Sequence, residues 1–180
     1  RSHHMTRDGQ EVAPIKTVVC NFTTPTENKP ALLSMDEVET LFHEFGHALD
    51  GLFAENTYPR TFVARDFVEL PSQIMEHWAT QPKVMKEYAQ HYETGEAIPD
   101  ALIQKIEKSS YFNQGFANVE YLAASLLDMA YHTLEEPKDL QTMEFEKEYL
   151  NSIGLIPEIE PRDHSTYFGH IMGGYSAGYY

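Results

Sequence analysis

The sequence has a single cysteine, Cys20, among its 180 residues. One cysteine excludes a disulfide within the chain and fits a protein that is kept in a reducing compartment. We therefore expect a cytoplasmic location, with the periplasm as the alternative.

Basic residues are also scarce. Lysine and arginine together number 13, against 28 aspartates and glutamates, which gives a net charge of −15. A charge of this sign and size repels nucleic acid phosphates and anionic membrane surfaces. Neither nucleic acid nor a membrane is expected as a partner.

Long apolar runs are absent as well. The best candidate, Val119–Ala130, is interrupted by Glu120, Ser125 and Asp128, whereas a membrane-spanning helix needs about 18 apolar residues in succession. The sequence contains no internal repeat and no low-complexity tract. Its length is sufficient for one domain with a real core.

The first residues resemble the remainder of an expression tag. Residues 1–4 read Arg-Ser-His-His, and such segments carry no information about the fold. His3 and His4 are therefore left out of any count of metal ligands.

The most informative stretch is a helix predicted over residues 34–53. Ser34 and Glu37 form the S-x-x-E pattern of a capping box, directly before apolar residues at helical spacing. The middle of this helix reads His-Glu-Phe-Gly-His over residues 43–47. A metal-binding motif is thus predicted to lie on a helix, which is the context that it requires.

The spacing of this motif suits a single metal ion. His43 and His47 are four positions apart, so their imidazoles project from one helix face about one turn apart. Glu44 points slightly aside, where it can reach a water bound to the metal without being a ligand. The expected number of chance matches in a chain of this composition is roughly 0.05.

Hydrophobic spacing and the positions of proline and glycine predict a mainly α fold with at most a short strand segment. The strand is expected at Ile15–Phe22, which is rich in β-branched and aromatic residues, before a polar turn over 25–30. Further helices are predicted over about 68–80, 82–94, from Pro99 onward, 116–133, 140–153 and 165–172, with a connecting segment over 54–65 and a loop over 156–161.

Two histidines do not complete a catalytic zinc site, which takes three protein ligands and keeps one open position. Glu69, near the start of the next helix, is one candidate for the third ligand, but it can equally be a capping-box partner of Asp66. Glu76 is the rival, and it can instead accept a hydrogen bond from the second ring nitrogen of a ligand. Residue pattern alone leaves this choice open.

Four stretches carry a resemblance to a known family: residues 30–33 (Pro-Ala-Leu-Leu), 43–47, 66–73 (Asp-Phe-Val-Glu-Leu-Pro-Ser-Gln) and 170–175 (His-Ile-Met-Gly-Gly-Tyr). In combination they resemble the thimet oligopeptidase family of zinc metallopeptidases. Residues 52–53 (Leu-Phe) and 76–80 (Glu-His-Trp-Ala-Thr) are most similar to the bacterial peptidyl-dipeptidases, or dipeptidyl carboxypeptidases, of that family. The resemblance covers nearly all of the chain from about Ile15.

The resemblance implies a zincin-type helical catalytic region that hydrolyses peptide bonds with one Zn²⁺ per chain. Carried over onto this sequence, it makes His43, His47 and Glu69 the zinc ligands. Glu44 becomes the general base. The resemblance thus favours Glu69 over Glu76 as the third ligand.

The resemblance also places substrate-binding groups near the end of the chain. It implies that His170, Tyr175 and Tyr179 hold the peptide, and that His170 or Tyr179 stabilises the oxyanion. Without it, Tyr175, Tyr179 and Tyr180 would be described only as an aromatic cluster.

Two departures from the family pattern lie beside the expected site. The segment between His47 and Glu69 is a few residues shorter than usual and lacks a glycine-containing stretch. Asp50 stands where histidine is common. Neither departure involves a ligand, but the loop beside the site can differ from that of the family.

The expected activity is zinc-dependent hydrolysis of short peptides with release of C-terminal dipeptides. The alternatives are internal cleavage by an oligopeptidase, a non-catalytic zinc module, and a helical interaction protein in which the motif is incidental. Because family members are several times longer, residues 5–180 are expected to be part of a catalytic domain. Such a part is expected to be poorly active and to pack against the rest of its own chain.

Overall fold

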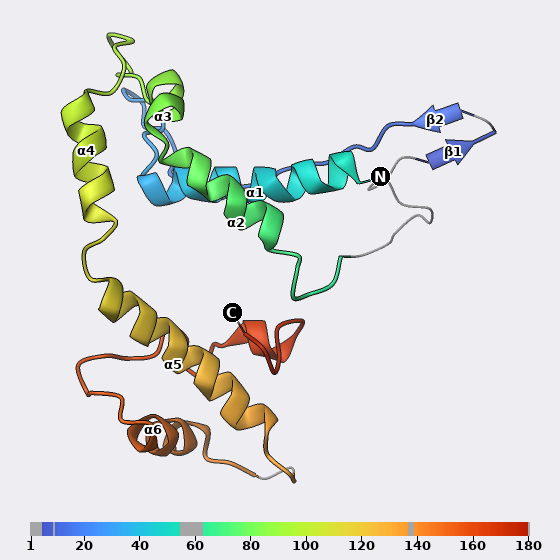
Figure 1. Cartoon of the computed structure of the whole chain (residues 1–180), viewed down its shortest axis with the longest axis vertical. Coiled ribbons are helices and arrows are strands. Elements are labelled where there is room, and N and C mark those ends of the chain that lie inside the picture. Colours follow the sequence, from blue (N-terminus) through green and yellow to red (C-terminus); the bar gives the residue numbers. More distant parts are fainter. Residues whose placement is uncertain (1–4, 9, 55–62, 137–138, 180) are drawn as a thin grey trace. The chain divides into compact units, whose positions relative to one another are not determined.

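The computed structural model describes residues 5–8, 10–54, 63–136 and 139–179. The tag-like residues 1–4, most of the connecting segment predicted over 54–65, and Tyr180 lie outside this part. The described part is mainly α-helical, as the sequence predicts (Figure 1). Its elements in chain order are β1 (Met5–Arg7), β2 (Gln10–Val12), α1 (Met35–Phe53), α2 (Leu70–Ala79), α3 (Pro82–Tyr88), α4 (Asp100–Ser109), α5 (Gln114–His132), α6 (Thr142–Ser152) and the 3₁₀ helix η1 (Gly169–Met172).

Contacts divide the chain into two compact units. The N-terminal unit ends at Ser109, and the C-terminal unit begins at Ser110. Among the helices of the described part, none combines the length and the apolar character needed to cross a membrane.

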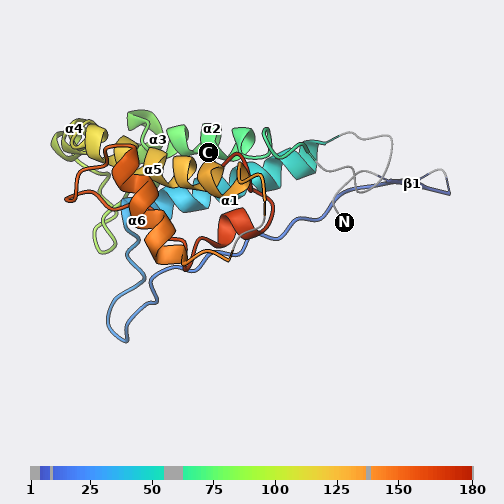
Figure 2. The same cartoon turned by 90° about the horizontal axis from the view of Figure 1, so that it is seen from below.

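The prediction of a strand over Ile15–Phe22 is wrong. These residues belong to an extended connection between β2 and α1, and no strand is formed there (Figures 1 and 2). Ile15 and Val19 are 71% and 82% exposed, so they lack the sheet neighbours whose packing favours such side chains in strands. The two described strands lie earlier, as an antiparallel pair with Met5 opposite Val12.

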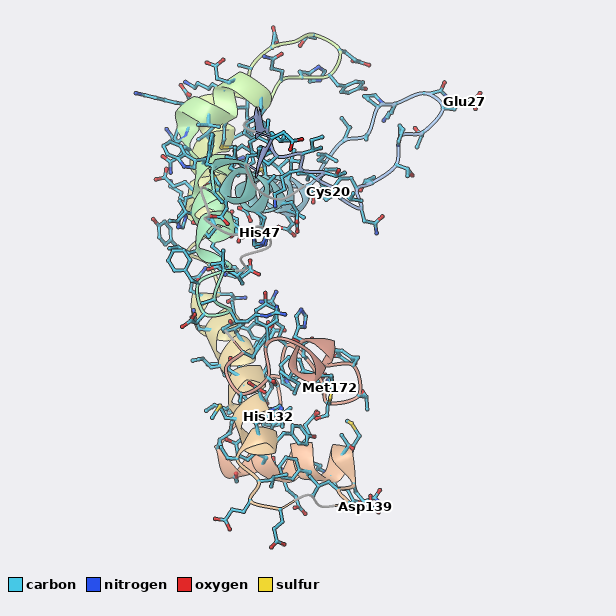
Figure 3. All side chains as sticks on the ribbon, turned by 90° about the vertical axis from the view of Figure 1, so that its right-hand side faces the viewer. Cys20, Glu27, His47, His132, Asp139 and Met172 are labelled. Carbon is cyan, nitrogen blue, oxygen red and sulfur yellow. The ribbon has the colours of Figure 1, made fainter. Side chains whose placement is uncertain are left out.

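The polar turn predicted over residues 25–30 is confirmed. The N–H of Thr26 donates to the carbonyl of Lys29 at 3.0 Å, and the N–H of Lys29 donates back at 3.3 Å. Glu27 lies at the tip of this turn (Figure 3). The turn reverses the chain shortly before α1.

The capping box at the start of α1 is also confirmed. The N–H of Glu37 donates to Ser34 Oγ at 3.2 Å, and the N–H of Ser34 donates to Glu37 Oε2 at 2.8 Å. The other carboxylate oxygen of Glu37 accepts hydrogen bonds from the N–H and Oγ1 of Thr23, at 2.6 and 2.8 Å. Glu37 therefore satisfies a helix terminus and ties the preceding connection to it.

Helices α1 and α2 cross closely and run in roughly opposite directions (Figure 1). Gly46 marks the contact, because a Cβ atom added there would lie 2.6 Å from the carbonyl oxygen of Pro71 and 2.6 Å from Cα of Ser72. No side chain fits at such a separation. The missing side chain of Gly46 therefore sets how closely the two backbones approach.

Helix α2 begins at Leu70, two residues later than predicted, with Pro71 in its first turn, where the missing N–H of proline leaves no hydrogen bond unmade. Helix α3 begins at Pro82 as predicted but ends at Tyr88, well before Gly95. Residues 90–97 instead form a separate turn in which Gly95 has a φ of +72°. A glycine in this conformation reverses the chain without steric cost.

The C-terminal unit is built on α5 and α6, both close to their predicted bounds. Its core contains Ala124, Phe168 and Ile171, with Tyr131 and Tyr179 packed against them. Of the helix predicted over 165–172, only the last four residues are helical, and they form the 3₁₀ helix η1.

The reason for the short helix lies in its first residues. The backbone N–H and Oγ of Ser165 both donate to Oε2 of Glu146 on α6, at 2.7 and 2.6 Å. The N–H of Tyr167 donates to the carbonyl of His164 at 3.0 Å, a hydrogen bond between residues three apart that closes a turn. Residues 165–167 consequently form a turn.

Candidate metal centre

His43 and His47 lie one turn apart on α1, as the motif spacing predicts. Their ring centroids are 4.9 Å apart and their planes are nearly perpendicular, at 85°. The side chains are 25% and 31% exposed, so both imidazoles are held by the fold and still reachable from solvent. Figure 3 labels His47 in the N-terminal unit.

Glu69 brings a carboxylate to both imidazoles. It is the residue that precedes α2, and its Oε2 lies 3.2 Å from Nε2 of His43 and 3.0 Å from Nε2 of His47. The Oγ of the fully buried Ser72 donates to the same Oε2 at 2.8 Å. Because the start of α2 is fixed against Gly46 on α1, the carboxylate is held near both histidines.

These three residues fit a zinc ion. Each offers one ligand atom, and the three atoms all lie within 4.8 Å of one another. In a tetrahedral zinc site with bonds of about 2.0–2.1 Å, neighbouring ligand atoms are about 3.3 Å apart. The two nitrogen–oxygen distances are close to that separation, and two imidazoles with one carboxylate are a donor set that suits catalytic zinc.

Glu76 occupies a different place beside His43. Its Oε1 lies 2.6 Å from Nδ1 of His43, the ring nitrogen that does not face Glu69. If this Nδ1 carries the proton and donates to Glu76, Nε2 keeps its lone pair for a metal. Glu76 therefore has the geometry of an acceptor that orients a ligand, which is the second of the two roles considered for it.

Glu44 follows His43 on α1 and is partly exposed. A helix turns by about 100° per residue, so this carboxylate is directed to one side of the two imidazoles. This placement is compatible with a general base, and Glu44 does not belong to the group of potential metal ligands.

His170, Tyr175 and Tyr179 come together within the C-terminal unit. The ring of His170 lies 6.4 Å from that of Tyr175 and 5.6 Å from that of Tyr179. The N–H of Tyr175 donates to the carbonyl of His170 at 3.2 Å. The structure thus gathers the three residues that the resemblance assigns to substrate binding, and all three belong to the C-terminal unit.

The hydroxyl of Tyr179 is protonated at neutral pH and can donate a hydrogen bond. Burial raises the pKa of its hydroxyl above the ordinary 10.0, and the nearby negative charge of Asp163 acts in the same direction. The hydroxyl donates to Asp163 Oδ2 at 3.4 Å. At neutral pH it keeps its proton.

Two buried carboxylates of the C-terminal unit were missed from the sequence. Asp128 and Glu146 lie on α5 and α6, and both are almost completely buried. Their signal in the sequence was a single acidic residue at a core-facing position of an otherwise amphipathic helix. A buried charge of this kind needs several hydrogen-bond partners, and the pattern does not say which residues supply them.

Comparisons with known proteins identify relatives of this chain. The chain is 51% identical over 173 residues to the dipeptidyl carboxypeptidase of Escherichia coli (strain K12), an alignment that covers 93% of this chain and 25% of that protein. It is 35% identical over 187 residues to the probable cytosolic oligopeptidase A of Arabidopsis thaliana, covering 100% of this chain and 27% of that protein. It is also 34% identical over 177 residues to mitochondrial intermediate peptidase 1 of Cryptococcus neoformans var. neoformans serotype D (strain B-3501A), covering 97% and 23%.

The chain therefore spans about a quarter of the length of the curated relatives it matches. A comparison with protein families gives a match over residues 2–180, nearly the whole chain. The family matched is described as peptidase family M3. On this evidence the chain belongs to peptidase family M3.

Proposed function

We propose that His43, His47 and Glu69 hold one Zn²⁺ and that the site hydrolyses peptide bonds. The observation that carries this proposal is the approach of the Glu69 carboxylate to both Nε2 atoms, at 3.2 and 3.0 Å. Membership of a peptidase family supports the same reaction. The zinc ion, when bound, would lower the pKa of a water molecule toward neutrality and polarise the peptide carbonyl.

The residues of the chain then divide the remaining tasks. Glu44 takes a proton from the attacking water and later delivers it to the amine that leaves. Glu76 keeps the proton on Nδ1 of His43 and so fixes the orientation of that ring. His170 and Tyr179, with Tyr175, hold the peptide, and a protonated Tyr179 donates a hydrogen bond to the developing oxyanion.

The proposed substrates are short peptides, from which the full-length enzyme releases C-terminal dipeptides. The 51% identity to a dipeptidyl carboxypeptidase supports this specificity. Relatives named oligopeptidases are 32–35% identical, so internal cleavage of short peptides is the alternative. Because the chain spans a quarter of these relatives, activity is best measured on the full-length protein that contains it.

A non-catalytic zinc module is disfavoured by the number of ligands. Within the described residues, the group around His43 contains three potential ligands and no fourth. A structural zinc site is almost always closed by four protein ligands, whereas a catalytic site keeps one position for water or substrate. Three ligands therefore support a site that performs chemistry.

The test separates metal binding from proton transfer. In the full-length protein, Glu44→Gln should retain one zinc per chain and lose peptide hydrolysis, since a general base contributes about 10²–10⁴-fold. Glu39→Gln, on the same helix, is the matched control and should keep both properties. Metal analysis and cleavage of short peptides measure the two outcomes. Hydrolysis by Glu44→Gln at the parent rate would contradict the mechanism.

A further inference from the structure

Asp128 is a buried carboxylate that the mechanism above does not use. It lies on α5, and its side chain is fully buried. Its Oδ1 accepts the backbone N–H of Ala177 at 3.0 Å, and its Oδ2 accepts those of Gly178 and Tyr179 at 2.8 and 3.0 Å. One carboxylate thus binds three consecutive peptide groups that follow it by 49 to 51 positions.

The segment bound by Asp128 has little regular structure of its own. Helix η1 ends at Met172, and residues 173–177 form turns. Ala177 has a φ of +58°, a left-handed conformation that is unfavourable for a residue with a side chain. Around such a residue, successive N–H groups can point to one side and form a concavity that binds an anion. Here the anion is the Asp128 carboxylate, which stabilises the turn from α5.

The charge of Asp128 strengthens this contact. Burial by itself would raise the pKa of the carboxyl group, but the three backbone hydrogen bonds and the neighbouring His132 lower that pKa below its ordinary value. Nδ1 of His132, which is labelled in Figure 3, lies 2.8 Å from Oδ1. Asp128 therefore stays ionised at neutral pH. Hydrogen bonds to a charged acceptor are shorter and stronger than neutral ones.

The same contact fixes the Tyr179 side chain. Its ring packs edge-on against Phe168, with centroids 4.9 Å apart and planes at 88°. The rings of His170 and Tyr121 each lie 5.6 Å from it. Asp128 holds the backbone of Tyr179, and the surrounding rings hold its side chain. The hydroxyl donates to Asp163 Oδ2 at 3.4 Å and would exchange that acceptor for the substrate. Its position thus depends on Asp128, a carboxylate that does not contact it.

We propose that Asp128 is a positioning residue for peptide hydrolysis, which holds the 177–179 turn so that Tyr179 donates to the substrate in the reactive orientation. This role rests on the proposed function, in which Tyr179 contacts the peptide. Substitution of Asp128 should therefore change turnover and not metal binding, because all three proposed zinc ligands belong to the N-terminal unit.

Glu146 offers a matched control in the same unit. It is also buried and ionised, and its carboxylate accepts hydrogen bonds from Ser165 and from Nδ1 of His164. It does not hold the 177–179 turn. A substitution there removes a buried charged acceptor from the C-terminal unit without touching the backbone of Tyr179.

The experiment compares Asp128→Asn with Glu146→Gln in the full-length, zinc-loaded protein. In Asp128→Asn, amide hydrogen exchange of residues 177–179 should become at least about tenfold faster, since charged acceptors contribute most to such hydrogen bonds. Its kcat should fall by about 10²-fold, the size expected for a misplaced catalytic group. Its KM and zinc content should change by less than about threefold, because His170 and Tyr175 still hold the peptide and the proposed zinc ligands belong to the N-terminal unit. Glu146→Gln should leave kcat within about threefold of the parent.

A second variant approaches the contact from the other side. Ala177→Pro removes one donor N–H and is incompatible with a positive φ, so it should reproduce the loss of kcat even if Asp128→Asn fails to fold. Unchanged exchange at residues 177–179 in Asp128→Asn, or an unchanged kcat despite faster exchange, would overturn the positioning role. An equal loss of kcat in Glu146→Gln would also overturn it. Loss of zinc or inactivity of the parent would instead contradict the proposed function.

Discussion

Oε1 of Glu76 lies 2.6 Å from Nδ1 of His43, while Oε2 of Glu69 lies 3.2 Å from Nε2 of the same ring. The imidazole is therefore held between two carboxylates, one directly before α2 and one within it. Such a pair assigns different roles to the two ring nitrogens, because a hydrogen bond at one determines which of them is free to bind a metal.

The first prediction concerns Glu76. Glu76→Gln keeps an acceptor oxygen but loses the charge, and it should weaken zinc binding by about tenfold, whereas Glu76→Ala should weaken it by about a hundredfold. Competition with a chromogenic chelator measures both affinities. Glu87→Gln on α3, an exposed position, is the control and should bind zinc as the parent does. Parent-like affinity in Glu76→Ala would remove Glu76 from the site.

The second prediction concerns the third ligand. Glu69→Gln should reduce zinc affinity by more than the roughly 10–100-fold expected for a group outside the ligand set, because it replaces an anionic ligand by a neutral amide. Asp66→Asn, just before the same helix, tests whether a nearby negative charge is sufficient, and it should have little effect. Unchanged zinc affinity in Glu69→Gln would count decisively against the proposed ligand set.

The third prediction concerns the helix crossing. In Gly46→Ala the added Cβ would meet backbone atoms of Pro71 and Ser72 at 2.6 Å, so α1 and α2 must move apart. We expect a loss of about 1–3 kcal/mol in the free energy of unfolding and weaker zinc binding, because Glu69 precedes Leu70 at the start of α2. Denaturant unfolding and chelator competition measure the two effects.

Gly115 provides the control for that substitution. It also lies in a helix, α5, but a Cβ added there meets no atom within 4 Å. Gly115→Ala should therefore be neutral or slightly stabilising, as helix propensity predicts. If both alanine variants behaved alike, the close approach at Gly46 would not be what holds Glu69 near the histidines.

The features predicted correctly from the sequence are local ones. The capping box of Ser34 and Glu37 and the helical spacing of His43 and His47 depend on residues three or four positions apart. Such patterns are set by the geometry of a single helix. Helix bounds were accordingly accurate to within two residues at most ends.

The missed features depend on contacts between distant segments. The choice between Glu69 and Glu76 required the crossing of α1 and α2, and residue pattern alone left it open until the family resemblance favoured Glu69. The strand predicted at Ile15–Phe22 failed because β propensity expresses packing against neighbours. The partners of Asp128 lie 49 to 51 positions away. No local pattern contains that information.

The last prediction concerns the pH dependence of stability in the C-terminal unit. Nδ1 of His164 lies 2.6 Å from Oε1 of Glu146. The hydrogen bond that His164 donates to Glu146 raises the pKa of His164 above its ordinary 6.5, although burial opposes this. Burial opposes ionisation of Glu146 as well, but hydrogen bonds from Ser165 and His164 outweigh it and lower the pKa of that carboxyl below its ordinary 4.5.

The two pKa shifts affect the stability of the folded chain in opposite directions of pH. A raised histidine pKa contributes stability that is fully present below pH 6.5 and is lost as the pH rises through the folded-state pKa. A lowered glutamate pKa contributes stability that is present above pH 4.5 and is lost as the pH falls through the folded-state pKa. The pair should therefore stabilise the folded chain most between these two values.

A comparison of the parent chain with His164→Gln measures the contribution of His164, whose Nε2 also lies 3.2 Å from Oε2 of the exposed Glu160. Near pH 5.5 the variant should lose about 1–3 kcal/mol of unfolding free energy, the size of a hydrogen bond to a charged group. The difference between the two proteins should shrink as the pH is raised through the folded-state pKa of His164, since His164 then loses its charge in both states. Denaturant titrations at several pH values give this difference directly. A difference that stays constant over this range would mean that the His164–Glu146 contact does not depend on the histidine charge.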